Sequence, residues 1–363
     1  MLARCLNSVR KIADEIVIVD TGSRDKTPEI ARQFTDRVYS FDWIDDFSAA
    51  RNLSFSKATK DYIMWLDADD IINDDNRDKF VQLKESLSPD TDVVMLPYLN
   101  ADNPSFTYYR ERIVRRESNP LWKEPVHEHL TIRGNVIQFE AAVIHNPGKR
   151  DESHGERNLR IYRNRLNSGE TLTTRGTYYY ARELKAHRHW EEAATQYRAA
   201  LQKPDIWVED AIAACGDLSD CELRTGQGSR ALNTLFSSFA YDLPRAEILC
   251  KIGAFYLKNR AYFKAIYWYS LALEAPVPKK SWGFTFSDYY DYIPHMQMCV
   301  LYDRVGEREK AFAHHEAAKK IRPDNPAVVY NDDYFAKLRS LTPKISTEFS
   351  PQGEQSPPLG RMC

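Results

Sequence analysis

The chain has 363 residues, of which 43% are hydrophobic and 28% are charged, and its formal net charge is −2. This length allows two domains with large cores, and the near-neutral charge gives no reason to expect nucleic acid as a partner. No apolar stretch approaches the roughly 20 residues of a membrane-spanning helix, so no transmembrane segment is expected.

The chain contains six cysteines, at positions 5, 215, 221, 250, 299 and 363, and none of them form a CxxC pair. This spacing fits neither a zinc site nor a disulfide framework. No signal peptide precedes the first expected strand. We therefore expect a cytoplasmic protein whose cysteines are mostly reduced core residues.

The first 70 residues alternate between patterns typical of helices and of strands. In chain order, we expect an amphipathic helix at 1–12, a buried strand at 15–20, a helix beginning at Thr27, a short strand at 38–41, a helix opened by 47–52 and a strand at 62–66. Strands that alternate with helices predict a parallel sheet with right-handed crossovers. The fold class expected for this half is therefore α/β with a mostly parallel sheet.

Three carboxylates, Asp67, Asp69 and Asp70, directly follow the apolar strand Tyr62–Leu66. This segment has the length and composition of a buried parallel strand, and open α/β sheets bind ligands at the carboxyl ends of such strands. Because the three carboxylates would repel one another, we expect a divalent cation, Mg²⁺ or Mn²⁺, that also contacts a diphosphate. The alternative is an acidic first turn of the next helix, which the helix dipole favours.

Asp20 ends the expected strand at 15–20 and precedes the turn residues Thr21–Asp25. The carboxyl ends of parallel strands open on the same edge of a sheet, so Asp20 is expected near the Asp67–Asp70 cluster. There it could accept a hydrogen bond from a nucleobase or a ribose. The alternative role for Asp20 is that of a turn former.

Three segments carry a specific resemblance to a known family. They are residues 14–27, the segment Phe47–Asn52 with its Ala-Arg-Asn, and the segment Leu66–Asp70. In this order and at these separations they resemble glycosyltransferase family 2. Members of that family have the GT-A fold and invert the anomeric centre of the transferred sugar.

The resemblance also implies roles for individual residues. Asp20 would contact the nucleoside, and Arg51 would lie near the diphosphate or line the nucleotide pocket. Asp69 would be the direct metal ligand, with Asp67 on the nucleotide-sugar. The implied cofactors are therefore a divalent metal and a nucleotide-sugar co-substrate.

This sequence departs from the family pattern at its start. Family members begin with a strand, often ending in Lys-Asn-Glu, before the helix that here starts at Met1. That strand normally forms part of the nucleotide pocket and occupies a central position in the sheet. We therefore expect reduced stability and weak donor binding for the chain as given. Restoring an upstream strand without any change in donor affinity would refute this.

Beyond the acidic cluster, the sequence predicts a buried strand at 92–98 and an arginine-rich strand at 108–116. We interpret most of these arginines as a solvated edge that blocks further strand pairing. One or two of them could contact phosphate.

The segment from Trp122 to His129 is the second one with dense chemistry, and its Val-His-Glu recurs in the tetratricopeptide-linked branch of the family. An inverting transferase needs a base beside the acceptor hydroxyl or thiol, and a metal neutralises the leaving diphosphate. Glu128 is the first candidate for the base and His127 the second. His145 could complete the metal shell. The alternative is that these histidines are loop or core residues with satisfied hydrogen bonds.

The composition changes near residue 148, after which the pattern is helical. We expect the catalytic domain at 1–148, a linking helix within 149–175, tetratricopeptide-like repeats at 176–340 and a disordered tail at 341–363. The repeats show self-similarity at about 34 residues, and such arrays bind peptides or form dimers, so a homodimer is one expectation. Trp282–Phe286 is an aromatic insertion between repeats that we expect to touch a neighbouring helix or a partner.

Together these features predict an inverting, metal-dependent glycosyltransferase. The donor would be a UDP-hexose such as UDP-glucose or UDP-GlcNAc. The helical array resembles that of peptide S- and O-glycosyltransferases, which favours a peptide Cys or Ser as acceptor over a cell-surface polysaccharide or other glycan. The second hypothesis is a tetratricopeptide binding scaffold with an impaired catalytic domain. A nucleotidyltransferase is less favoured, because no Gly-rich basic loop occurs near the start.

Overall fold

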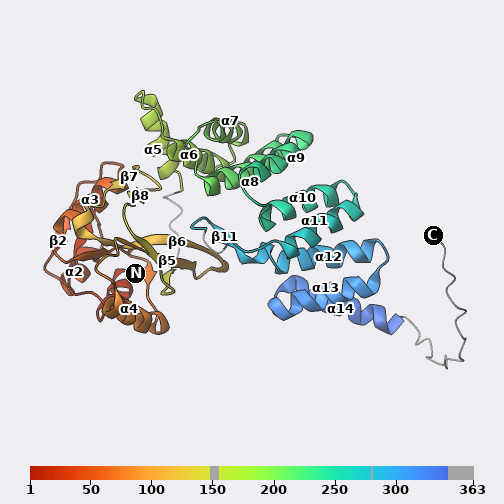
Figure 1. Ribbon diagram of the computed structural model, residues 1–363, viewed down its shortest axis with the longest axis horizontal. Helices are drawn as coiled ribbons and strands as arrows, with labels where there is room; N and C mark the ends of the chain where they lie inside the picture. Colours follow the sequence, from red (N-terminus) through yellow and green to blue (C-terminus); the bar gives the residue numbers. More distant parts are fainter. Residues whose placement is uncertain (148–154, 279–280, 342–363) are drawn as a thin grey trace, which may run out of the picture.

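The computed structural model describes residues 1–147, 155–278 and 281–341. The chain forms an α/β unit, from which an array of helices extends toward the opposite end of the molecule (Figure 1). This order confirms the expected fold class, an α/β domain followed by an all-α array. Within the described residues, none of the helices is both long and apolar enough to cross a membrane.

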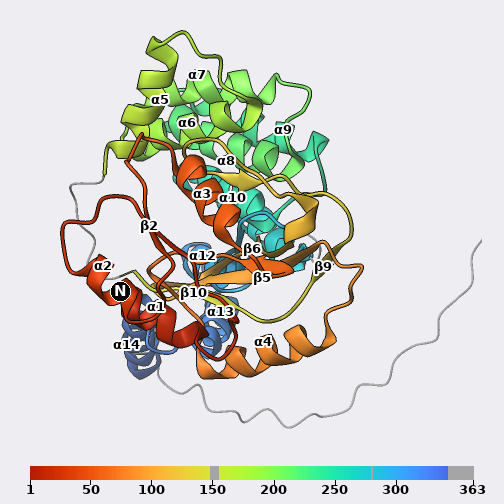
Figure 2. The ribbon, with the colours of Figure 1, turned by 90° about the vertical axis from the view of Figure 1, so that its left-hand side faces the viewer.

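The α/β unit alternates short strands with helices. Its elements are α1 (Leu2–Val9), β1 (Ile18–Asp20), α2 (Thr27–Arg32), β2 (Val38–Ser40), α3 (Phe47–Lys57), β3 (Tyr62–Met64), β4 (Asp70–Ile71), α4 (Asp74–Ser86), β5 (Val93–Asn100), β6 (Asn103–Arg115), η1 (Arg116–Ser118), β7 (Trp122–Lys123), β8 (His129–Leu130), β9 (Val136–Gln138) and β10 (Val143–His145). The amphipathic helix α1 buries Cys5, Leu6 and Val9. Helices α3 and α4 cover opposite faces of the sheet (Figure 2).

The larger sheet is mixed rather than mostly parallel. It also includes β11 (Thr285–Phe286), and its order is β11-β6-β5-β10-β4, with β3 paired to β6 and β9 paired to β5. β5 and β6 form a long antiparallel hairpin, and β3 pairs antiparallel with β6, so Ile63 lies opposite Val114. The strand expected at Tyr62–Leu66 is therefore shorter and antiparallel, because its neighbour is the returning arm of this hairpin. The parallel pairs are β1–β2, β5–β9 and β5–β10.

A cavity of about 560 Å³ lies between β3 and the residues that lead into β1. Its apolar lining includes Val17, Phe55, Ile63, Trp65 and Phe80. Among the described residues, β1 pairs only with β2 and β3 pairs only with β6. β1 is half-buried, whereas the sequence pattern predicted a buried strand, because only one of its edges has a partner. The expected weak donor binding stays a prediction.

The helical array begins after β10. Its elements are α5 (Arg157–Asn167), α6 (Thr174–Ala186), α7 (Trp190–Leu201), α8 (Val208–Arg224), α9 (Gly228–Ser237), η3 (Ser238–Ala240), α10 (Ala246–Lys258), α11 (Tyr262–Glu274), η4 (Ser287–Tyr289), α12 (Tyr292–Arg304), α13 (Arg308–Ile321) and α14 (Pro326–Leu341). Successive helices pack as pairs, α6 with α7, α8 with α9, α10 with α11 and α12 with α13. Ala193, Ala265 and Ala311 are fully buried in these pairs, where a small side chain lets the helices approach closely.

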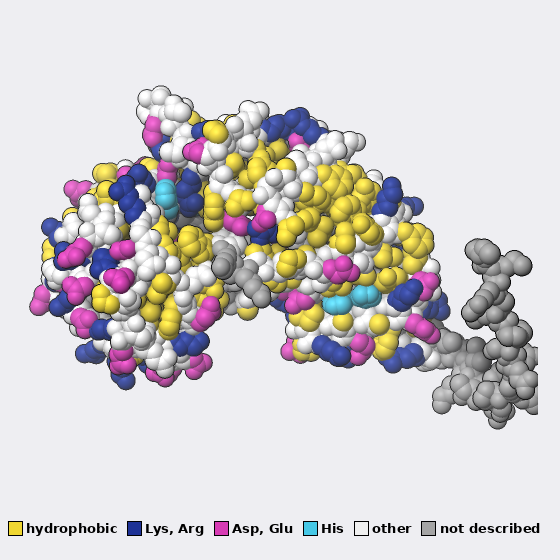
Figure 3. Space-filling view, viewed as in Figure 1, with side chains coloured by type: hydrophobic (Ala, Val, Ile, Leu, Met, Phe, Trp, Pro, Cys, Tyr) yellow, Lys and Arg dark blue, Asp and Glu magenta, His cyan; other side chains and the backbone are white. Residues whose placement is uncertain are grey.

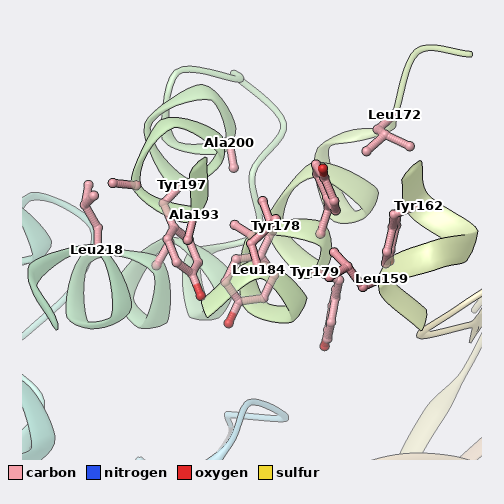
Figure 4. Packing of buried hydrophobic residues seen from close by; sticks show 14 of the residues in the cluster. Leu159, Tyr162, Leu172, Tyr178, Tyr179, Leu184, Ala193, Tyr197, Ala200 and Leu218 are labelled. Carbon is pink, nitrogen blue, oxygen red and sulfur yellow. The ribbon is translucent and has the colours of Figure 1, made fainter. Parts of the chain in front are cut away.

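The first helices of the array share one core with a loop of the α/β unit. Figure 4 shows this cluster, from Leu159 and Tyr162 on α5 to Leu218 on α8. Val126, which lies between β7 and β8, belongs to the same cluster and is 2% exposed. Tyr162 also donates a hydrogen bond from its hydroxyl to Val126 O at 3.4 Å. The array is therefore packed onto the α/β unit and not merely tethered to it.

The aromatic insertion between α11 and α12 makes a second connection. Its strand β11 pairs antiparallel with β6, so that Phe286 lies opposite Phe106. The ring centroids of these two residues are 4.7 Å apart, and the ring of Phe284 lies 5.0 Å from that of Tyr108.

The insertion was expected to touch a neighbouring helix or a partner, and it does contact helices: the Arg182 guanidinium on α6 lies 4.7 Å from the Phe284 ring centroid, and Gly283 closely approaches Glu209 on α8. It also extends the sheet of the α/β unit.

Two expectations concern residues outside the described ranges. The tail expected at 341–363 falls almost wholly on residues 342–363, and the linking segment expected at 149–175 includes residues 149–154. The cysteines at 5, 215, 221, 250 and 299 are buried and free, as their spacing predicted.

Replacing Gly283 by alanine tests the close approach of the insertion to α8. The new Cβ would lie 2.8 Å from Cβ of Glu209, an atom fixed to the helix backbone. We expect the variant to lose about 1–3 kcal/mol of stability, as overpacking typically costs. In the control Gly228→Ala, the new Cβ would lie 3.6 Å from Phe255, so that variant should not lose stability. Thermal unfolding followed by circular dichroism measures both, and an unchanged midpoint for Gly283→Ala would contradict the close approach.

Candidate active site

The carboxylates after β3 lie on a turn. Asp70 N donates a hydrogen bond to Asp67 O at 3.0 Å, and Asp70 then opens β4. Helix α4 begins only at Asp74, so the alternative of an acidic first helical turn is wrong for these carboxylates. We call the segment Asp67–Asp70 the acidic turn.

Asp70 is the buried anchor of the acidic turn. Its side chain has no exposed area, and Nη1 of the equally buried Arg112 lies 2.9 Å from its Oδ2. The hydroxyl of Tyr98 donates to Asp70 Oδ1 at 2.6 Å, and the backbone N–H of Asp67 donates to Oδ2 at 3.0 Å. The charge of Asp70 is thus balanced and both of its oxygens accept hydrogen bonds, so the turn is held in one conformation.

The arginines in the middle of β6 are not a solvated edge. The guanidinium of Arg112 lies 3.8 Å from the ring centroid of Trp65 and 4.3 Å from that of Tyr98. Arg110 lies 4.8 Å from the same Trp65 ring, and its Nε is 3.3 Å from Oε2 of Glu111. The expectation of an edge was wrong because β6 has strand partners along both of its sides.

Arg51 bridges the acidic turn and the second chemical segment. Its Nη2 lies 2.6 Å from Asp67 Oδ1, and its Nε lies 2.7 Å from Glu128 Oε1. The guanidinium also lies 4.8 Å from each of the ring centroids of Trp65 and Trp122. Two carboxylates and two aromatic rings thus hold one arginine, which α3 presents from its second turn.

The partners of Asp67 decide its charge. Burial raises the pKa of the Asp67 carboxyl, but the positive charges of Arg51 and Arg112 outweigh burial and lower this pKa to about 2. Asp67 is therefore ionised at neutral pH and directed toward Arg51.

The geometry groups His145 with Asp69 and Asp70 as the candidate metal ligands. Their ligand atoms all lie within 4.8 Å of one another, and Asp67, which was also expected to be a ligand, is not in this group. His145 lies opposite Asp70 in the β10–β4 pair, and its Nδ1 is 3.7 Å from Asp69 Oδ1 and from Asp70 Oδ1. This Nδ1 is buried without a hydrogen-bond partner among the described residues. A buried imidazole nitrogen that faces two carboxylates fits a divalent cation.

Asp20 lies at the end of β1, in the two-stranded sheet of β1 and β2. Its carboxylate accepts a hydrogen bond from the backbone N–H of Ser23 at 3.2 Å, which is the turn-forming role considered as the alternative. Within the described residues, no hydrogen bond or ion pair joins Asp20 to Asp67, Asp69 or His145.

His127 faces the helical array. Its Nε2 lies 2.7 Å from Oε1 of Glu183 on α6, and its ring stacks on that of Tyr179 with the centroids 4.4 Å apart. Burial raises the pKa of Glu183, but the hydrogen bond and charge of His127 outweigh burial and lower it. The two candidate bases thus point to different partners, His127 to the array and Glu128 to Arg51.

A cavity of about 640 Å³ opens between the two halves of the chain. We call it the interdomain cavity. The α/β unit contributes residues of β6 and β8, and α6, α8, α10 and the aromatic insertion contribute the opposite walls. Its lining includes Arg110, Glu128, His129, Arg175, Tyr179, Arg182, Trp207, Asp210, Trp282 and Phe284. A ligand in this cavity would reach Glu128 from the side of the array.

Sequence reasoning missed three residues that hold the site together: Tyr98, Arg112 and Glu183. Tyr98 lies in a segment that was expected to be a buried strand. Because a buried hydroxyl needs a hydrogen-bond partner, this tyrosine could have been predicted to bind a polar group. Arg112 was grouped with exposed arginines, because Arg110 and Glu111 precede it in the sequence. Nothing in the sequence predicted the contact of Glu183 with His127, since Glu183 lies on a helix of the array.

Comparison with known proteins supports this two-part organisation. Residues 1–144 match the family model described as "Glycosyl transferase family 2". Over 211 residues, the chain is 27% identical to the SPbeta prophage-derived glycosyltransferase SunS of Bacillus subtilis, covering 55% of this chain and 50% of SunS. It is also 51% identical over 70 residues to a TPR repeat-containing protein of Synechococcus elongatus, covering 19% of this chain and 17% of that protein. An uncharacterized glycosyltransferase of Rickettsia felis is 30% identical over 89 residues, covering 24% of this chain and 31% of that protein.

The N-terminal part of the chain is therefore similar to a family 2 glycosyltransferase domain. The chain joins this domain to a helical array of the tetratricopeptide type. It spans half or less of the length of the curated relatives named above.

Replacing Arg112 by methionine tests the anchor of the acidic turn. The variant leaves Asp70 buried without its counter-charge, so we expect a loss of about 3–5 kcal/mol of stability. The control Arg77→Met removes an ion pair whose Asp74 side chain is 87% exposed, and it should cost less than about 1 kcal/mol. Urea unfolding followed by tryptophan fluorescence measures both. Equal losses in the two variants would contradict the role of Arg112.

The Asp210 carboxyl gives a pH-dependent prediction. Burial raises its pKa to about 6, although Arg175 and Arg182 act in the opposite direction. As the pH rises from about 4 to 6, the unfolded state ionises first, so the folded state loses stability relative to it. Asp210→Asn should thus be more stable than the parent by roughly 2–3 kcal/mol at neutral pH, and equally stable near pH 4.

Unfolding free energies measured across this pH range test the prediction. The matched control is Asp324→Asn, at an exposed position of the array, which should unfold with nearly the same free energy as the parent. If the unfolding free energy of Asp210→Asn differs from that of the parent by the same amount near pH 4 and at neutral pH, the prediction is wrong.

Proposed function

We propose that the chain transfers a hexose from a UDP-sugar to a peptide side chain, with inversion at the anomeric carbon. The observation that carries this proposal is the Arg51 bridge, with Asp67 at 2.6 Å on one side and Glu128 at 2.7 Å on the other. It couples the acidic turn, where a nucleotide diphosphate would bind, to the interdomain cavity, where an acceptor would bind.

The donor would bind at the acidic turn. Asp69 and His145 would hold Mg²⁺ or Mn²⁺, with Asp70 as a further oxygen donor beside them. The bound cation supplies the positive charge that stabilises the departing diphosphate. Asp67 and Arg51 would orient the nucleotide-sugar, and Asp20 would contact its nucleoside, as the resemblance implies. UDP-glucose and UDP-GlcNAc are the donors to test first.

Glu128 is the proposed base. It lines the interdomain cavity, and Arg51 engages its Oε1, so the carboxylate is held in place. It would take the proton from the acceptor hydroxyl or thiol as that atom bonds to the anomeric carbon. The bond from this carbon to the diphosphate oxygen breaks in the same step, which inverts the centre. His127 would act as a positioning residue, because its Nε2 is bound to Glu183 on α6.

The acceptor is proposed to be a peptide Cys or Ser. The helices of the array form one side of the cavity, and arrays of this type present surfaces that bind extended chains. Aromatic side chains also line the cavity, including Tyr179, Trp207 and Trp282. Such rings also suit a sugar acceptor, so glycans belong in the test as competing acceptors.

Thermal unfolding with UDP-glucose or UDP-GlcNAc, each with and without Mn²⁺, tests the donor site. We expect a metal-dependent rise in Tm for the parent chain and for Glu128→Gln, and none for Asp69→Asn. Glu128→Gln should also transfer sugar roughly 10²- to 10⁴-fold more slowly, as loss of a general base typically does. The control is Asp75→Asn, an exposed acid on α4, which should behave as the parent chain does.

Mass spectrometry of peptides and glycans incubated with these donors tests the transfer. A mass increase of one hexose or one N-acetylhexosamine on a peptide is the expected result. If no nucleotide-sugar shifts Tm and no acceptor gains mass, the glycosyltransferase proposal is wrong and the binding scaffold becomes the better hypothesis.

A further inference from the structure

Arg182 on α6 has no carboxylate at ion-pair distance among the described residues, although Asp210 and Asp217 lie near enough to interact with its charge. It lines the interdomain cavity, yet across residues 1–147, 155–278 and 281–341 its side chain makes neither a hydrogen bond nor an ion pair. Its guanidinium lies instead among aromatic rings, 4.7 Å from the centroid of Phe284, 5.5 Å from that of Tyr179 and 5.9 Å from that of Tyr178. Burying part of a cation in this way costs free energy unless an anion pairs with it.

The other charges of the cavity are mostly balanced. The pairs are Arg110 with Glu111, Glu128 with Arg51, Glu183 with His127, Glu209 with Arg245, and Asp210 with Arg175. The last pair is the loosest, with 4.0 Å between Asp210 Oδ2 and Arg175 Nη1. Arg182 is therefore the arginine in this lining that has no carboxylate at ion-pair distance among the described residues.

Glu247 is the acid in the lining that faces no arginine or lysine at ion-pair distance. The hydroxyl of Tyr290 hydrogen-bonds to its Oε2 at 3.2 Å. Burial raises the pKa of the Glu247 carboxyl, which favours its neutral form. Glu247 therefore competes weakly with an incoming anion for Arg182.

The rings around Arg182 restrict the plane of its guanidinium. Stacking uses the faces of the group and leaves its N–H edges for hydrogen bonds. Edges held in this way match the two oxygens of a carboxylate, which arginine binds in bidentate fashion. This arrangement thus suits an anion that presents two oxygens side by side, as a carboxylate does.

The position of Arg182 relates this anion to the acceptor. Its chain neighbour Glu183 binds His127, and His127 precedes Glu128, the proposed base. Arg182 and Glu128 line the same cavity, whereas the donor's diphosphate would bind at Asp69 and His145 on the acidic turn.

We propose that Arg182 binds a carboxylate of the acceptor peptide, and so selects peptides with an acidic group near the modified residue. This inference rests on the proposed function, because it assumes that a peptide occupies the interdomain cavity. The carboxylate is that of an Asp or Glu side chain or of a peptide C-terminus, and the experiment distinguishes these sources.

The test uses pools of short synthetic peptides with one central Ser or Cys and randomised flanking residues. One pool has free C-termini and the other has amidated C-termini. Each is incubated with the full chain, UDP-glucose or UDP-GlcNAc, and Mn²⁺, and the modified peptides are sequenced by mass spectrometry. Modified peptides should be enriched in Asp or Glu at one flanking position by roughly 10- to 100-fold, as expected for a charged hydrogen bond. Enrichment of free C-termini at one spacing would identify a terminal carboxylate instead.

Variants assign this preference to Arg182. Arg182→Gln should lower the enrichment to near onefold, and Arg182→Lys, which keeps the charge but not the planar edge, should retain part of it. The control is Arg224→Gln, since Arg224 also lies over an aromatic ring, 5.8 Å from the Trp190 centroid, but outside the cavity. It should keep the full preference. The metal-dependent Tm rise with the donor should be the same in all three variants.

Three outcomes would overturn the proposal. They are peptide transfer without acidic enrichment, enrichment that persists in Arg182→Gln, and transfer to glycans alone. In each of these the donor-dependent Tm rise stays intact, so the glycosyltransferase proposal survives. Loss of that rise in the parent chain would instead contradict the proposed function itself.

Discussion

The buried ion pair between Arg112 and Asp70 is the interaction on which the candidate site depends. Both side chains are completely buried, and removing two charges from water costs several kcal/mol for each. The Tyr98 hydroxyl, the Asp67 backbone N–H and the Trp65 ring surround the pair and offset this cost. Because Arg112 balances the charge of Asp70, the acidic turn can direct its other two carboxylates to different partners. Asp67 faces Arg51, and Asp69 faces His145.

A continuous series of contacts leads from this turn to the helical array. Asp67 binds Arg51, and Arg51 binds Glu128. The residue before Glu128 is His127, which binds Glu183 on α6. The array therefore supports the loop that carries the proposed base, and it closes the cavity that this base faces. Apolar side chains cover much of the array's surface in the view of Figure 3, so its helices offer further contact area for an extended ligand.

Local patterns in the sequence predicted the fold class, the helices α1 and α3, and the acidic residues that follow β3. They also brought Glu128, His127 and His145 to notice, because each stands beside an expected strand end or turn. The patterns could not predict that β3 pairs antiparallel with β6, since strand direction depends on which distant segments meet. The patterns also could not predict the burial of Arg112 or the pairing of Asp67 with Arg51. Both require contacts between residues far apart in the chain, which no periodicity records.

Two residues of the larger sheet come from the segment between α11 and α12, because β11 pairs with β6. The border between the two halves in space therefore does not coincide with a single point in the gene. A recombination event that exchanged the whole array would also remove a strand from the sheet of the α/β unit. Adding or deleting a helix pair between α5 and β11 would move this strand away from Phe106. Changes in repeat number during evolution are thus expected beyond β11, among α12, α13 and α14, while the number of helices before it is constrained.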